Sequence, residues 1–121
     1  MGIPLKVERE ALLDAVTAVS GSGPAYVFYF IEALQQAARE VGLDDTAGRA
    51  LALETFKGAV KLAAESPEDV ATLRARVTSK GGTTAAALAS MEQAGVKNAI
   101  VRAVIAADGR SRELGDELGR D

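Results

Sequence analysis

The sequence predicts an all-α protein of five to seven helices, and three features of its composition and pattern indicate this. Apolar residues make up 48% of the 121 residues but aromatic residues only 4%, so the runs typical of strands are scarce. Apolar positions recur at helical spacing along most of the chain. Glycines and prolines separate these periodic segments. A chain of this length is expected to form one domain.

The first two helices are expected in residues 8–19 and 25–41. Residues 21–23 are expected to end the first, and Pro24 suits the first turn of the second, where the N–H group that proline lacks is not needed. The second helix is apolar on nearly all sides in its first half, which is typical of a helix buried on several sides. Gly42 is expected to end it. The apolar stripe of the first helix consists of Leu12, Leu13, Val16 and Val19.

The third helix is expected to begin at residues 44–46 and to run to Glu65. Ser66 then fits the N-cap of a short fourth helix and Pro67 its first position, followed by acidic residues that complement the positive helix end. The apolar positions of this fourth helix are Val70, Leu73 and Val77.

Two more helices complete the pattern. Residues 79–82 break the periodicity before a fifth helix that Gly95 closes. The last helix is expected over residues 96–114, with Gly109 inside it at a cost of about 1 kcal/mol relative to alanine.

The two ends of the chain are expected to lie outside the folded domain, which spans residues 8–115. Residues 1–7 are predicted to be a chain start joined to a linker, and residues 116–121 a frayed tail. The longest apolar run, residues 25–31, is far too short to cross a bilayer. Without a signal core behind a basic start, a cytoplasmic location is expected.

Charge and missing residue types narrow the chemistry. The net charge of −3 disfavours a nucleic-acid partner, which would need a clustered basic surface. The sequence contains no Cys and no His. It therefore has neither a thiolate nucleophile nor the usual general base and metal ligands, and no metal site is predicted.

Residues 80–84 (KGGTT) could form a small anion site. Two glycines before a helix allow unusual backbone conformations and leave the first N–H groups of the helix uncovered, where the helix dipole favours an anion. The threonine hydroxyls add donors. From spacing alone, a capped turn between two helices is the more common explanation.

The second Gly-rich segment, residues 21–24 (GSGP), does not fit dinucleotide binding, because it lacks both the GxGxxG spacing and a preceding strand. By itself it predicts a turn between two helices. Tyr26 and Tyr29, which follow it, are predicted to be core or interface anchors.

Taken together, these segments resemble a known family. Residues 19–26 (VSGSGPAY) and 77–84 (VTSKGGTT), with residues 51–66 between them and RSRELG at residues 110–115, are similar to the C-terminal dimerisation domain of pyrroline-5-carboxylate reductase. The resemblance covers nearly the whole chain. It implies a helical domain of the 6-phosphogluconate-dehydrogenase C-terminal type that intertwines with a second copy as a homodimer. In many members such dimers assemble further into rings.

The resemblance also implies an activity and its residues. Members of this family reduce 1-pyrroline-5-carboxylate to L-proline with NADPH or NADH and without a metal. In this chain Thr84 matches a catalytic threonine that faces the ring nitrogen. The substrate carboxylate is held by the segment matching Ser79, Gly81, Gly82, Thr83 and Thr84. The segment matching Ser22, Gly23 and Pro24 lies near the active site.

The sequence departs from the family in several ways. The Rossmann domain has no counterpart in these 121 residues, so the chain alone is expected to be inactive. Lys80 stands where the family usually has proline, Lys57 occupies a usually apolar position, and Gly109 replaces a helix former. The alternative interpretation is a non-catalytic helical oligomerisation module, or an engineered scaffold derived from this domain.

Overall fold

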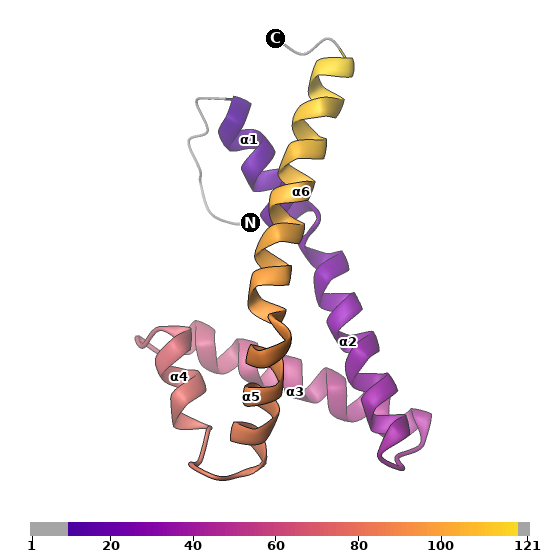
Figure 1. The fold of residues 1–121 in the computed structure, drawn as a ribbon, viewed down its shortest axis with the longest axis vertical. Coiled ribbons are helices and arrows are strands. Elements are labelled where there is room, and N and C mark those ends of the chain that lie inside the picture. Colours follow the sequence, from indigo (N-terminus) through magenta and orange to yellow (C-terminus); the bar gives the residue numbers. More distant parts are fainter. Residues whose placement is uncertain (1–9, 119–121) are drawn as a thin grey trace. The chain divides into compact units, whose positions relative to one another are not determined.

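The computed structural model describes residues 10–118, which fold into six α-helices and one π-helical turn (Figure 1). The all-α prediction is confirmed. The helices form two units, one made of the segments up to Tyr26 and from Gly95, the other of Val27–Ala94. Each unit is described by itself. The linker expected in residues 1–7, and residues 119–121 of the expected tail, lie outside the described residues.

The first unit contains α1 (Glu10–Val16), the π-helical turn η1 (Thr17–Gly21), the start of α2 (Gly23–Glu40) and α6 (Val96–Glu117). Helix α6 contacts both α1 and η1. These contacts bury the Ala18 side chain to 1% exposure.

The first helix ends at the expected position but in an unexpected form. The α-helix gives way to η1 after Val16, and the Ser22 N–H donates to the Thr17 carbonyl five residues back at 2.8 Å. The helical segment then ends at residues 21–23, as predicted. Ser22 itself keeps right-handed helical torsion angles, φ −85° and ψ −13°. A bend at Ser22 separates η1 from α2, and Pro24 lies in the first turn of α2 as expected.

The second unit holds most of α2, α3 (Asp45–Glu65), α4 (Val70–Arg76) and α5 (Thr83–Ala94). Gly42 closes α2 as predicted, with a φ of +104°. The N–H groups of Gly42 and Leu43 donate to two of the last carbonyls of α2, which satisfies groups that a helix end leaves open. Asp44 then caps α3 by accepting from the Ala47 N–H at 2.8 Å.

Helices α2 and α3 approach closely at two points. A Cβ built on Gly48 would lie 3.1 Å from the Ala38 Cβ. The rings of Phe30 and Phe56 meet edge to face, with their centroids 5.5 Å apart. Ala52, on α3, is buried to 4% exposure. Gly48 and Ala38 thus allow the close approach at the first of these points.

The predicted cap of the fourth helix is wrong. Ser66 ends α3 by donating its N–H to the Leu62 carbonyl, and its hydroxyl accepts from the Glu68 N–H at 3.1 Å. Asp69 caps α4 instead, accepting from the Thr72 N–H at 2.9 Å. Hydrogen bonds from the backbone and side chain of Thr72 lower the pKa of the Asp69 carboxyl below the usual 3.8. Pro67 lies in the turn between the two helices, because α4 begins only at Val70.

Many large apolar side chains on the helices are exposed. In α2, Val27 and the three aromatic residues that follow it lie on the surface. The expectation that this helix is buried on several sides is therefore not met within a single chain. Exposed apolar residues also occur on the other long helices, including Leu51, Val60, Met91, Val101 and Ile105.

Candidate functional site

The turn between α4 and α5 needs both of its glycines, each for a different reason. Gly81 has a φ of +74°, a conformation that other residues rarely adopt. Gly82 approaches Ser79 so closely that a Cβ would lie 3.3 Å from the Ser79 carbonyl oxygen. The Gly82 N–H donates to that same oxygen at 3.0 Å. These contacts close residues 79–82 into a tight turn directly before α5.

This turn leaves the start of α5 open to a ligand. The Gly82 carbonyl accepts from the Ala86 N–H at 3.1 Å, which is the first hydrogen bond of the helix. The N–H groups of Thr83, Thr84 and Ala85 therefore have no carbonyl four residues back to which they could donate within the helix. The side chains of both threonines are exposed, as is that of Lys80. Backbone N–H groups and two threonines thus lie in the first turn of α5, and Lys80 precedes it in the sequence. This combination suits a small carboxylate.

The second predicted segment lies at the start of α2, in the other unit. The Ser22 carbonyl accepts from the Ala25 N–H at 3.1 Å, and a Cβ on Gly23 would meet no atom of this chain within 4 Å. The Tyr26 hydroxyl donates to the Ala18 carbonyl at 2.7 Å. The structure thus places residues 79–84 together in one unit, and Ser22, Gly23 and Pro24 together in the other.

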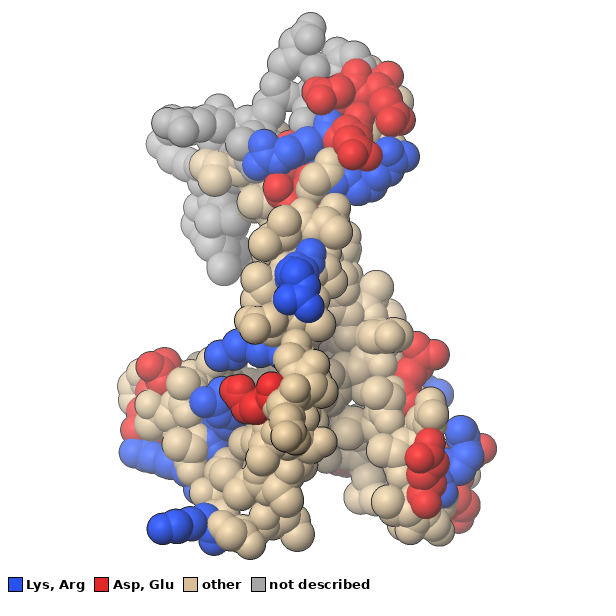
Figure 2. Space-filling view, viewed as in Figure 1, with Lys and Arg blue, Asp and Glu red and all other residues tan. Residues whose placement is uncertain are grey.

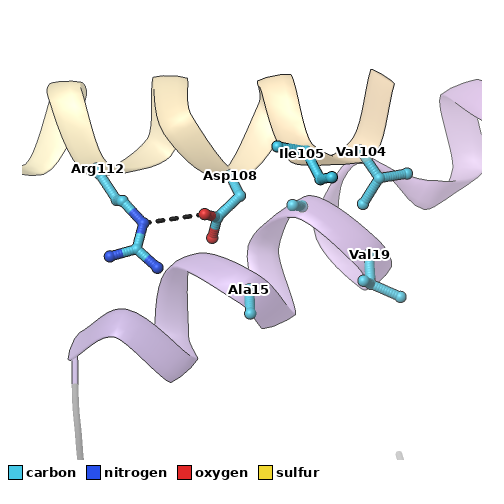
Figure 3. Close-up of a pocket in the computed structure, with 7 residues that line it drawn as sticks. Ala15, Val19, Val104, Ile105, Asp108 and Arg112 are labelled. Atoms are coloured by element: carbon cyan, nitrogen blue, oxygen red, sulfur yellow. Dashed lines mark hydrogen bonds and ion pairs between the residues drawn. The ribbon is translucent and has the colours of Figure 1, made fainter. Parts of the chain in front are cut away.

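The first unit also carries an open pocket of about 260 Å³ between α6 and the segment α1–η1 (Figure 3). Its walls are mostly aliphatic, and it contains none of the predicted site residues. Asp108 accepts from the Arg112 Nε at 2.9 Å. The other Asp108 oxygen is buried without a hydrogen-bond partner. The residues that line the pocket are Ala15, Ala18, Val19, Val104, Ile105, Asp108 and Arg112.

Other kinds of site find little support in the described part of the chain. It contains no cluster of three or more acidic residues that could hold a metal ion. None of its helices combines the length and apolar character needed to span a bilayer. On the face shown in Figure 2, basic and acidic side chains are intermixed. On α6, for example, Arg110 pairs with Glu113 and Glu117 at 3.0 and 3.3 Å.

Comparison with known families assigns this fold. Residues 10–114 match the family described as pyrroline-5-carboxylate reductase dimerisation. The chain belongs to this family. The predicted resemblance is therefore confirmed for the fold and the family.

The relatives are pyrroline-5-carboxylate reductases that are longer than this chain. The Pseudomonas aeruginosa enzyme is 44% identical over 120 residues, which cover 99% of this chain and 44% of that protein. The Synechocystis enzyme is 49% identical over 106 residues, which cover 88% of this chain and 40% of that protein. The chain thus spans about two fifths of the length of these pyrroline-5-carboxylate reductases.

Solved structures agree with this assignment. The Plasmodium falciparum pyrroline carboxylate reductase with NADP bound has a TM-score of 0.85 and 39% identity, covering 88% of this chain and 41% of that chain. The Coxiella burnetii pyrroline-5-carboxylate reductase has a TM-score of 0.85 and 40% identity, and the match covers 89% of this chain and 40% of that chain.

Sequence reasoning missed one feature near the predicted site, the π-helical turn together with the Tyr26 hydroxyl that bonds to it. Gly21 and Gly23 indicated the helix end, but nothing in the sequence indicated the extra residue in the turn before it. The tyrosine eight residues after Ala18 was assigned to the core or an interface, and no pattern of spacing linked it to that carbonyl.

Proposed function

We propose that this chain is the dimerisation and substrate-binding part of a pyrroline-5-carboxylate reductase. The complete enzyme would reduce 1-pyrroline-5-carboxylate to L-proline in the cytoplasm with NADPH or NADH. Membership of the dimerisation family and identity of 44% and 49% to two such reductases support this proposal.

The observation that carries the proposal is the open start of α5. In our proposal the substrate carboxylate accepts hydrogen bonds from the N–H groups of residues 83–85 and from the hydroxyls of Ser79 and Thr83. Thr84 faces the ring nitrogen and is the catalytic residue. The substrate brings its own electrophilic C=N bond, so the protein mainly has to position it. This explains how a chain without His or Cys could serve such a reaction.

The same proposal includes a homodimer. A helix such as α2 that exposes Val27, Phe28, Tyr29 and Phe30 is poorly suited to a monomer in water. Interfaces of obligate dimers often bury more than about 2,000 Å² and resemble a domain core cut in half. We propose that a second copy covers these side chains, and that such dimers assemble further into rings in the complete enzyme.

The nicotinamide cofactor would supply the hydride that adds to the ring carbon of the C=N bond. The described residues form helices only and offer no strand followed by a Gly-rich turn, so they do not fit a dinucleotide. We therefore expect the 121 residues alone to oxidise NADPH or NADH with pyrroline-5-carboxylate no faster than a protein-free blank. Turnover that depends on this protein would show that it contains a cofactor site.

A titration of the chain with L-proline, followed by NMR, tests the substrate site. Shifts at the amides of residues 79–86 that saturate in the millimolar range or below would support the proposal. L-Leucine, which has a carboxylate but no ring, serves as the control ligand. If no amide shifts with L-proline at concentrations up to its solubility, the chain is an oligomerisation module without a working site.

A further inference from the structure

The π-helical turn before the GSGP segment creates a local problem in hydrogen bonding. In an α-helix the Ser22 N–H would donate to Ala18, four residues back. In η1 it donates to Thr17 at 2.8 Å instead, so the Ala18 carbonyl loses that donor. Water cannot easily replace it, because Ala18 is only 1% exposed. Such a buried carbonyl needs a partner.

Tyr26 supplies this partner from the first turns of α2. Its hydroxyl lies 2.7 Å from the Ala18 carbonyl oxygen, and the bond is partly buried. The interaction joins residues on the two sides of the Ser22–Gly23–Pro24 turn.

We propose that Tyr26 is a positioning residue, whose hydroxyl holds η1 in its five-residue spacing and thereby fixes the backbone of Ser22, Gly23 and Pro24 for substrate binding. This role rests on the proposed function and on the resemblance described above, which implies that the segment matching this turn lies near the active site. Single π-helical turns inside helices are often found at functional sites. Here the extra residue rotates the chain that follows it, so the turn would point differently if the spacing changed.

The chain itself provides a matched control. Tyr29 lies one helical turn further along α2 and is 76% exposed in the single chain, and Tyr29→Phe keeps the ring that the proposed dimer would cover. Tyr26→Phe and Tyr29→Phe each remove one hydroxyl and keep the ring. Only the first change leaves the Ala18 carbonyl without its donor.

Two measurements on the full chain test this proposal, the exchange rate of the Ser22 amide hydrogen and the affinity for L-proline. Tyr26→Phe should raise the exchange rate about fivefold or more, because the turn opens more often once a typical hydrogen bond that closes it is lost. It should also weaken L-proline binding by at least about threefold. Tyr29→Phe should change neither quantity. Retained helical circular dichroism shows that each variant is folded.

The outcomes separate this role from the substrate site itself. Faster exchange at Ser22 with unchanged L-proline affinity in Tyr26→Phe would show that the hydroxyl only stabilises the turn, and would overturn the positioning role. Unchanged exchange would show that the hydroxyl does not hold the turn, and would overturn it too. If the unmodified chain does not bind L-proline at all, the proposed function fails, and the positioning role fails with it.

Discussion

Ser111 donates its hydroxyl to Asp14 Oδ1 at 2.8 Å, and this bond joins α6 to α1 across 97 positions of the sequence. Asp14 is 2% exposed, so its carboxylate depends on protein donors rather than on water. Ser111→Ala removes one of them. We expect the free energy of unfolding to fall by about 1–3 kcal/mol, the usual cost of a buried charged group that loses a hydrogen bond.

Ser90→Ala is the control for this prediction, since Ser90 is exposed on α5 and its replacement should change stability by less than about 0.5 kcal/mol. Urea denaturation at one protein concentration measures both variants. Equal midpoints for the two variants would show that the link between Asp14 and Ser111 does not stabilise the fold.

Two Gly→Ala substitutions in helices should have opposite effects on stability. At Gly109 a Cβ meets nothing within 4 Å, so alanine should stabilise α6 by about 1 kcal/mol through its helix propensity. At Gly48 the new Cβ would lie 3.1 Å from the Ala38 Cβ, and neither atom can rotate away. The crowding should outweigh the gain in propensity and destabilise the chain by up to about 2 kcal/mol.

The substitution Ala38→Gly tests whether crowding against Ala38 causes the loss of stability in Gly48→Ala. Combined with Gly48→Ala, it should recover part of the lost stability, because the two sites are in contact and their effects are not additive. Thermal melts of the four related proteins measure this coupling. Purely additive effects, or a loss of stability in Gly109→Ala, would contradict the prediction.

The pH dependence of stability should include a contribution from Asp69. The hydrogen bonds from Thr72 lower its pKa in the folded chain below the ordinary 3.8. The folded state therefore binds this proton more weakly than the unfolded state. The ionised Asp69 cap contributes its full stabilisation above pH 3.8. This contribution is lost as the pH falls through the lower pKa of Asp69 in the folded chain.

Asp69→Asn keeps an acceptor for the cap but removes the titrating group. We expect the melting temperature of this variant to fall less steeply with acid than that of the unmodified chain. Asp69→Ala should lower the melting temperature already at neutral pH. Parallel pH curves for the Asn variant and the unmodified chain would exclude this role of Asp69.

The sequence predicted the features that depend on neighbouring residues. Gly42 ends α2 and Asp44 begins α3 because each acts on backbone groups a few positions away. The cap of α4 was missed because Ser66 and Asp69 are both good caps, and the end of α3 uses the first. The apolar pattern also could not show that α2 is exposed in a single chain. A helix that packs in the core of its own chain and a helix that packs against a second chain have the same apolar pattern.

In the candidate site, too, the sequence predicted the features that depend on neighbouring residues and missed those that depend on more distant ones. The two glycines before α5 correctly indicated a tight turn, because Gly81 needs its positive φ and Gly82 its lack of a side chain. The bond between Tyr26 and Ala18 spans two helices and depends on one extra residue in η1, which no local rule signals. The roles of Ser79 and Thr84 stay predictions, because they depend on where a ligand sits.

The exposed apolar surface leads to a prediction about assembly. We expect sedimentation of the chain at low micromolar concentration to give the mass of a dimer or a multiple of it. The melting temperature should rise with protein concentration, because association favours the folded state. A monomer that melts cooperatively at that concentration would contradict the proposed dimer.

The last prediction concerns the donors at the start of α5. Thr84→Val keeps the shape of the side chain and removes its hydroxyl. It should weaken L-proline binding by about 1–3 kcal/mol, the usual range for a hydrogen bond to a charged group or for a buried polar atom left without its partner. Thr55→Val, at an exposed position on α3, is the matched control and should bind as the unmodified chain does.

A substitution at Lys80 tests whether L-proline is held by the lysine charge or by the donors at the start of α5. Its side chain is exposed, so its attraction for a carboxylate is screened and worth only about 0–1 kcal/mol. Lys80→Pro introduces the residue that the family resemblance implies at this position, and it stiffens the turn before Gly81. It should leave L-proline binding unchanged or strengthen it. If Lys80→Pro abolishes binding while Thr84→Val has no effect, the lysine charge holds the anion, and the assignment of the substrate site to the start of α5 is wrong.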